Sequence, residues 1–225
     1  MPNKLPTLEE LFKNGVHYGH LKKFSHPRSR SYIYTTLNKT YVIDLEKTIK
    51  QLEKAIDYIN NCAQDGKQIL WVGTKNNCHE LAKNLAEKLN HFYITNKWSA
   101  GILTNFDIIK LNLAKLNEML EQSEAEYFEK LTKIEKNKFN DKLKSLKDRF
   151  FGVRKMTKMP DVMIVLDPDK EKNAIREAKL LDIPMIGIGD TKTNPDLFDV
   201  FVPINDDGKK SLEIIFKTLE ENLGI

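Results

Sequence analysis

Short apolar runs separated by amphipathic stretches constrain the fold of this chain more than any other feature. The runs QILWVG at 68–73, DVMIVLD at 161–167 and PMIGIGD at 184–190 are apolar almost throughout. Such strands are typical of a parallel sheet that is covered on both faces, whereas half-exposed strands alternate apolar and polar residues. The three runs therefore predict buried strands of one parallel sheet.

Helices predicted between these strands complete an α/β pattern. Apolar residues of the stretch 44–63 recur at helical spacing, and they are Leu45, Ile49, Leu52, Ile56 and Ile59. The other predicted elements are helices at 76–89, at 170–182 and from Gly208, strands at 91–95 and 200–203, and a hairpin formed by Tyr32–Tyr34 and Thr40–Asp44. Strands that alternate with helices predict a doubly wound parallel sheet.

Residues 104–150 interrupt this alternation. Apolar residues there follow the spacing of a heptad seam in two stretches, which comprise Phe106, Ile109, Leu113, Leu116 and Leu120, and then Phe139, Leu143, Leu146 and Phe150. A polar link, EQSEAEY at 121–127, separates the two stretches. We predict an inserted antiparallel coiled-coil hairpin at 104–150, between two parts of an α/β domain at 1–103 and 151–225. Two ordinary helices packed on the sheet are the alternative.

The charge of the chain is unevenly placed. Of the 225 residues, 40% are hydrophobic and 30% are charged, and no apolar run approaches the roughly 18 to 20 residues of a membrane span. The net charge is +4, yet residues 1–35 carry six cations and two acids, and residues 128–158 carry eleven and four. Residues 160–225 carry eight cations and fourteen acids. Basic segments on an otherwise acidic body predict a side that faces a polyanion.

A doubly wound sheet suggests a nucleotide-binding enzyme as one alternative. The turn Gly73–Asn76 after the first buried strand has neither the dinucleotide glycine fingerprint nor the glycines of a phosphate loop. The turn Pro168–Glu171 carries negative charge, which would repel a phosphate. We therefore expect no cofactor, and a nucleotide- or sugar-phosphate-binding enzyme is the second hypothesis.

The segment 15–30, GVHYGHLKKFSHPRSR, suggests metal or catalytic chemistry because it holds three histidines. His17 and His20 are three residues apart, a separation that can place two zinc ligands on one helical face. A hydrolase would also need a carboxylate nearby, and none occurs between Glu10 and Asp44. We expect no metal site and no catalytic residue, and a zinc hydrolase is the third hypothesis.

The same segment has the composition of a surface for RNA. Four cations are interleaved with aromatic rings, so phosphate contacts and base stacking are both available. Two later connections, at 97–101 and at 154–158, add further basic residues. The predicted RNA-binding residues are His17, His20, Lys22, Lys23, His26, Arg28, Arg30, Lys97, Trp98, Arg154, Lys155 and Lys158.

Four motifs along the chain are distinctive, and they are LFKNGVHYGH at 11–20, KWSAGILTNF at 97–106, PDVMIVLDPDKEKNAIREAKLLDIP at 160–184 and GDTKTNPDLFDVFVPINDD at 189–207. Together they resemble family two of the small-subunit ribosomal proteins, in its bacterial and organellar form. The motifs occur in the order of the family, and the resemblance extends from Leu8 to Leu219. One departure is the run SHPRSRS at 25–31, which lacks the family's tryptophan, so RNA contacts there transfer by charge rather than by identity.

The resemblance implies a flavodoxin-like sheet with an inserted coiled-coil hairpin. It also implies a non-enzymatic structural protein of the small ribosomal subunit, without cofactor or membrane. The implied partners are small-subunit rRNA of the 16S type, neighbouring small-subunit proteins and, where an organism has it, the large mRNA-binding ribosomal protein one. The implied location is the ribosome of a plastid, a mitochondrion or a bacterium, and the excess of lysine over arginine favours an AT-rich genome.

Overall fold

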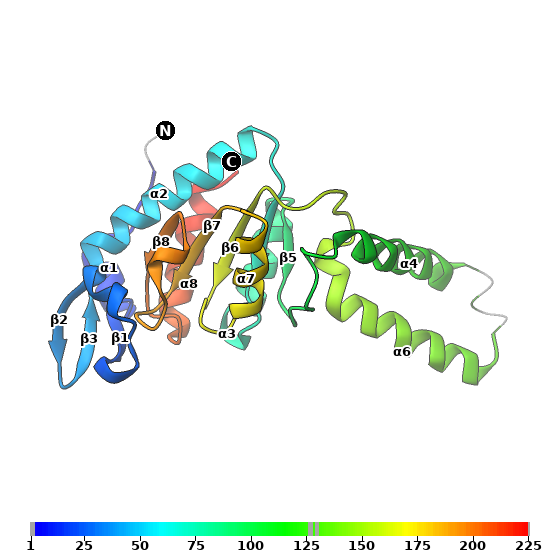
Figure 1. The fold of residues 1–225 in the computed structure, drawn as a ribbon, viewed down its shortest axis with the longest axis horizontal. Coiled ribbons are helices and arrows are strands. Elements are labelled where there is room, and N and C mark those ends of the chain that lie inside the picture. Colours follow the sequence, from blue (N-terminus) through cyan, green and yellow to red (C-terminus); the bar gives the residue numbers. More distant parts are fainter. Residues whose placement is uncertain (1–2, 126–127, 129–130, 225) are drawn as a thin grey trace.

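A five-stranded parallel sheet forms the centre of the protein in the computed structural model, which describes residues 3–125, 128 and 131–224. The strands lie in the order β5-β4-β6-β7-β8 (Figure 1). Their bounds are β4 Ile69–Val72, β5 Phe92–Ile94, β6 Val162–Leu166, β7 Met185–Gly189 and β8 Val200–Pro203. Counted along the chain, this is the 2-1-3-4-5 order of flavodoxin-like folds, which confirms the predicted fold class.

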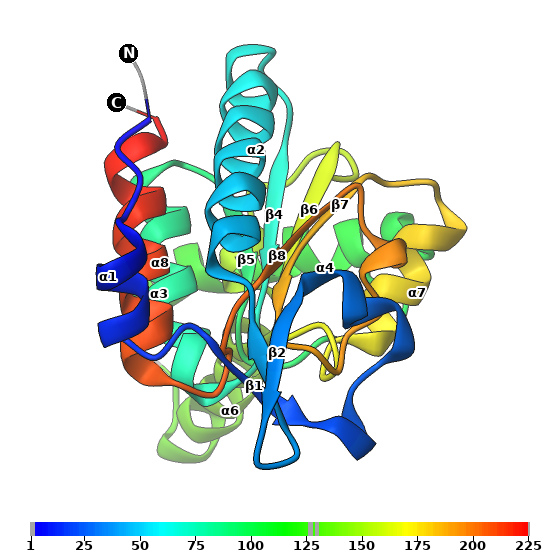
Figure 2. The same ribbon diagram turned by 90° about the vertical axis from the view of Figure 1, so that its left-hand side faces the viewer.

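Side chains of the strands alternate between two apolar cores, one on each face of the sheet. Ile69 and Trp71 belong to a core under α1, α2, α3 and α8, whereas Leu70 and Val72 belong to a core under α4, α6 and α7. The helices are α1 Leu8–Lys13, α2 Leu45–Gln64, α3 Asn76–Lys88, α4 Phe106–Glu124, α6 Lys133–Phe150, α7 Lys172–Leu180 and α8 Lys209–Asn222. Figure 2 shows α3 and α8 on one side of the sheet and α7 on the other. Within the described residues, no helix has the length and apolarity that a membrane span requires.

A three-stranded antiparallel sheet, in the order β1-β3-β2, is the main part of the N-terminal arm, a name we use for residues 15–43. Strands β2 Ile33–Leu37 and β3 Thr40–Ile43 form the predicted hairpin, and both residues of its turn have positive φ angles, as a tight hairpin turn requires. Strand β1 Tyr18–Leu21 is not predicted from the sequence, since YGHL lacks an alternating apolar pattern. Two 3-10 segments, η1 Lys22–Phe24 and η2 Pro27–Tyr32, follow β1.

Helices α4 and α6 pack against each other beyond the β5 edge of the sheet (Figure 1). Most residues of the predicted seam are buried, while Leu120 and Phe139 are partly buried. The last two residues of the predicted polar link, 126–127, lie outside the described residues. The coiled-coil winding of this pair and the domain limits at 104 and 150 stay predictions.

One buried carboxylate holds the connection from β5 to α4. Glu177 of α7 accepts hydrogen bonds from Trp98 Nε1 at 3.0 Å and from the backbone N–H groups of Gly101 at 2.8 Å and Leu103 at 3.0 Å. Burial alone would raise the pKa of Glu177, but these hydrogen bonds outweigh it and lower the pKa below its ordinary value. The carboxylate therefore fixes the 97–106 segment to α7.

Replacement of Glu177 by alanine should destabilise the fold, because buried donors then have no acceptor. We expect the Glu177→Ala variant to lose roughly 3 kcal/mol in the free energy of unfolding, measured by urea denaturation. The control is Glu213→Ala on the exposed side of α8, which should change stability little. Equal losses in the two variants would contradict this role of Glu177.

Candidate nucleic-acid interface

The N-terminal arm lies against the carboxyl ends of β7 and β8. The backbone N–H of His26 donates to the carbonyl of Thr191 at 2.8 Å, directly after β7. Ser29 Oγ donates to the carbonyl of Thr193 at 2.6 Å, and Asn205 N donates to the carbonyl of Val16 at 3.1 Å. In Figure 1 the arm is the blue segment at the end of the molecule opposite α4 and α6. The sheet thus positions a segment that has little apolar core of its own.

His20 fastens the arm to the sheet through two carboxylates. Its Nδ1 contacts Asp190 Oδ2, and its Nε2 lies 3.1 Å from Asp207 Oδ2. The hydrogen bond with Asp190 raises the pKa of His20 against the effect of burial. The inference that the histidines lack carboxylate partners is therefore wrong for His20, because its partners come from the distant end of the chain. Among the described residues, no group of three or more His, Cys, Asp or Glu side chains could hold a metal ion.

A lysine fills the place where doubly wound folds bind ligands. Lys75 follows β4, and its Nζ lies 2.8 Å from Asp167 Oδ2, 3.1 Å from Asp206 Oδ1 and 2.7 Å from Asp207 Oδ1. These carboxylates follow β6 and β8, so the ion pairs join three strand ends. Burial, with the nearby charge of Asp167, raises the pKa of Asp206 to about 7. At the carboxyl ends of the strands, where folds of this class bind ligands, the protein's own lysine thus pairs with three carboxylates.

Two of the predicted RNA-binding residues turn inward. The ring of His17 is 7% exposed and stacks on Phe12 with 4.2 Å between ring centroids, and burial lowers its pKa. The indole of Trp98 is 9% exposed and donates to Glu177. Both rings are therefore covered almost completely by other parts of the protein, and their role in RNA binding stays a prediction.

The cations of the arm are exposed. Lys22 and Lys23 lie in η1, where Lys23 Nζ is 4.6 Å from the centroid of the exposed Phe24 ring. Arg30 is exposed in η2, and Arg28 is exposed but paired with Asp196 at 3.3 Å. The arm therefore offers exposed cations to an external anion, with the exposed Phe24 ring beside them.

The other predicted cations lie elsewhere on the molecule. Arg154 and Lys155 line a hollow beside β5, and Arg154 stacks on the Phe151 ring at 3.7 Å. Lys97 lies beyond the carboxyl end of the same strand. Lys158 precedes β6 and pairs with Asp161 at 2.8 Å. Because β5 and β8 are opposite edges of the sheet, the structure separates these residues from the arm.

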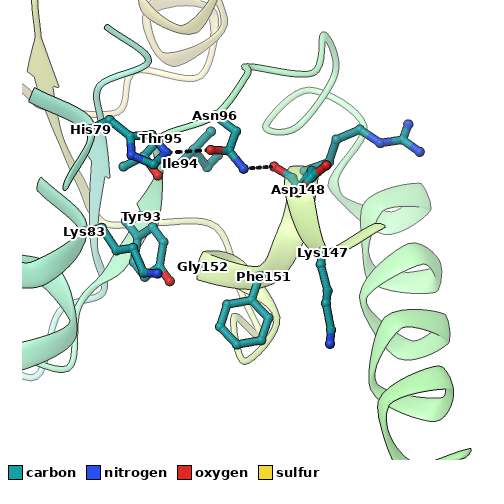
Figure 3. Close-up of a pocket in the computed structure, with 11 residues that line it drawn as sticks. His79, Lys83, Tyr93, Ile94, Thr95, Asn96, Lys147, Asp148, Phe151 and Gly152 are labelled. Carbon is teal, nitrogen blue, oxygen red and sulfur yellow. Dashed lines mark hydrogen bonds between the residues drawn. The ribbon is translucent and has the colours of Figure 1, made fainter. Parts of the chain in front are cut away.

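A second basic hollow of about 320 Å³ lies between α3, β5 and α6 (Figure 3). Lys83, Lys147 and Arg149 line it, together with residues 93–96. Asn96 crosses it, since its Oδ1 lies 2.6 Å from His79 Nε2 and its Nδ2 donates to the carbonyl of Asp148 at 2.9 Å. Gly152 also lines the hollow and has no room for a side chain, because a Cβ there would lie 2.2 Å from the carbonyl oxygen of Tyr93.

Sequence reasoning missed a further group of cations next to the arm. Lys172, Arg176 and Lys179 of α7 and Lys192 of the loop after β7 line a hollow that His26 also reaches. The cations of α7 recur at i, i+4 and i+7, the spacing of one helical face, and this signal is visible in the sequence. The spacing is easily overlooked because residues 160–225 carry more acidic than basic residues in total.

His20 should make the stability of the arm depend on pH. Because its folded-state pKa is raised, its contribution is fully present below about pH 6.5 and is lost as pH rises through the folded-state value. The charged groups that face it are Asp190, Asp207 and Lys192. We expect the backbone amides of 18–26 to exchange hydrogen faster as pH rises from about 6 to about 9, after correction for intrinsic exchange.

The His20→Gln variant should lack this pH dependence. His79→Gln, at the opposite edge of the sheet, should keep it and serves as the control. A wild-type arm whose corrected exchange does not change over this range would refute the assignment.

Comparison with known proteins identifies the family. The model of the ribosomal protein S2 family matches residues 11–223. The chain is 35% identical over 215 residues to small ribosomal subunit protein uS2 of Petrotoga mobilis, which covers 96% of this chain and 75% of that protein. It is 38% identical over 213 residues to proteins of the same name from two strains of Dehalococcoides mccartyi, covering 94% of this chain and 87% of each relative. With a match over nearly its whole length, the chain belongs to the ribosomal protein S2 family.

Proposed function

We propose that the N-terminal arm binds small-subunit rRNA of the 16S type. As a member of its family, the protein is a non-enzymatic structural constituent of the small ribosomal subunit. The observation that carries the proposal is the exposed set of arm cations, held at one end of the sheet by His20 and by backbone hydrogen bonds. A basic segment that is already held in place loses less conformational entropy on binding RNA than a flexible segment would.

The chemistry of the arm matches a phosphate backbone. Lys22, Lys23 and Arg30 supply the exposed cations, and Arg28 can exchange Asp196 for a phosphate. The ring of Phe24 is 57% exposed and can stack on an unpaired base. His26 accepts a hydrogen bond from Arg28 N and shapes the turn between the cations. Phosphate contacts of this kind position a protein on RNA without reading its sequence.

The partners follow from the family and from the separate basic sites. The relatives are small-subunit proteins of bacteria, so the protein is placed on the ribosome in the bacterial cytoplasm. We propose that Lys97, Arg154 and Lys155, at the β5 edge, face rRNA or neighbouring small-subunit proteins. We also propose that the protein helps dock the large ribosomal protein one where an organism has it.

Neutralisation of the arm should weaken association with the subunit. The test is a Lys22→Gln, Lys23→Gln, Arg28→Gln, Arg30→Gln variant that is added to small subunits stripped of this protein, with binding measured by co-sedimentation across a salt series. Each phosphate that the variant no longer neutralises should lower the slope of log affinity against log salt by about 1. The expected result is weaker binding and a flatter salt dependence.

A matched variant removes the same charge away from the arm. Lys50, Lys54, Lys209 and Lys210 are exposed on α2 and α8, and their replacement by glutamine should leave the salt slope close to wild type. Equal binding by the arm variant and the wild type would count against the arm as the RNA-binding surface.

A further inference from the structure

A groove beside the arm gathers cations that the proposed arm surface does not include. It is a cavity of about 570 Å³ between α7, the arm and the loop after β7, and we call it the α7 groove. The residues that matter here are His26, Lys172, Ile175, Arg176, Lys179 and Lys192. Three parts of the chain that are distant in sequence therefore meet around one hollow.

Three of these cations are available to a ligand. Arg176 and Lys179 are exposed on α7, and Lys192 is half-buried across the groove. Their side chains make no hydrogen bond or ion pair with any residue that the structure describes. Lys172 is different, because its Nζ lies 2.8 Å from Asp169 Oδ1. Since α7 rises about 1.5 Å per residue, Lys172 and Lys179 are about 10 Å apart along its axis, so the cations form a row.

Asp169 also lines the groove and pairs with Lys172, but other acids close to this row are engaged inside the protein. Asp190 and Asp206 are 2% and 5% exposed, and they face His20 and Lys75. Glu171 is 2% exposed and accepts from the backbone N–H of Thr74 at 2.8 Å. Glu177 is 8% exposed and is bound to the 98–103 backbone. A stretch that is acidic on average thus presents a basic groove.

The α7 groove is continuous with the arm. His26 lines the groove, and its N–H donates to Thr191 at 2.8 Å, next to Lys192. Arg28 follows in η2 and pairs with Asp196 of η4 Pro195–Leu197, on the loop that forms one wall of the groove. The cations of the groove therefore extend the cationic surface of the arm.

We propose that the α7 groove binds a segment of RNA phosphate backbone, as an extension of the arm surface. The inference rests on the proposed function and adds a second contact site to it. A phosphate backbone fits because unpaired cations in a row match repeated anionic groups, and because Arg176 can hold one phosphate through two hydrogen bonds. The groove would read charge and spacing rather than base sequence.

The test is an Arg176→Gln, Lys179→Gln, Lys192→Gln variant, compared with wild type in binding to small subunits stripped of the protein. The salt slope should fall by about 1 for each phosphate that is no longer neutralised, and by up to about 3 in total. A Lys50→Gln, Lys54→Gln, Lys210→Gln variant removes the same charge and should keep the wild-type slope. Thermal unfolding should change little in both variants, because the replaced groove side chains make no hydrogen bond or ion pair in the described structure and those of the control are exposed.

The outcomes separate this inference from the proposed function. If the groove variant keeps the wild-type slope while the arm variant has a flatter one, the groove inference is overturned and the proposed function stands. If the groove variant has the flatter slope while the arm variant does not, the arm proposal fails and the groove remains an RNA-binding site.

A photo-crosslinking amino acid in place of Lys179 identifies the class of partner in the assembled subunit. The same group in place of Lys54 is the control. A crosslink that ribonuclease removes supports the inference. A crosslink to another protein, or a Lys179 crosslink no stronger than that of the control, overturns it.

Discussion

The ion pairs of Lys75 are the interaction on which the rest of the surface depends. Its ammonium group gathers carboxylates that follow β6 and β8, and Asp207 also contacts His20 of the arm. Removal of Lys75 would leave the charge of the more buried partners, Asp167 and Asp206, uncompensated, which is destabilising. The same lysine lies at the carboxyl ends of the strands, which is where folds of this class bind nucleotides. In this protein, the position that serves catalysis or cofactor binding in other proteins holds ion pairs that connect strand ends with the arm.

At this end of the molecule, acidic side chains are engaged in internal contacts while basic side chains stay exposed. At least one carboxylate after each of β6, β7 and β8 contacts Lys75 or His20, and Glu171 and Glu177 accept hydrogen bonds from backbone N–H groups. The cations of the arm and of α7 are left on the outside. A modest net charge of +4 therefore includes an end of the molecule with a locally positive surface. Local arrangement, rather than net charge, makes this end suitable for a polyanion.

The fold could be predicted from the sequence to a large extent, because burial in a parallel sheet leaves continuous apolar runs and helices leave periodic ones. The helix predicted at 44–63 is α2 Leu45–Gln64, and it begins where Asp44 accepts hydrogen bonds from Glu46 N and Lys47 N. Strand β1 was missed because it is held by β3 and by Thr191 rather than by an apolar pattern of its own.

The candidate site was less predictable, because it depends on interactions between distant parts of the chain. The partners of His20, Asp190 and Asp207, lie 170 and 187 residues away in the sequence. In the sequence, Trp98 resembles a residue that stacks on RNA bases, but in the structure it is buried and donates a hydrogen bond to Glu177. The cations of α7 have a recognisable spacing, but only the tertiary structure places them beside the arm.

The central claim is that the end of the molecule formed by the arm and α7 faces the RNA. The most direct measurement is the rate at which an amine-reactive reagent modifies each lysine, in the free protein and in the assembled small subunit. The account predicts strong protection of Lys22, Lys23, Lys179 and Lys192 in the subunit, with Lys50, Lys54 and Lys210 unchanged. Protection confined to Lys83, Lys147 and Lys155 at the β5 edge, with the arm lysines as reactive as in the free protein, would contradict it.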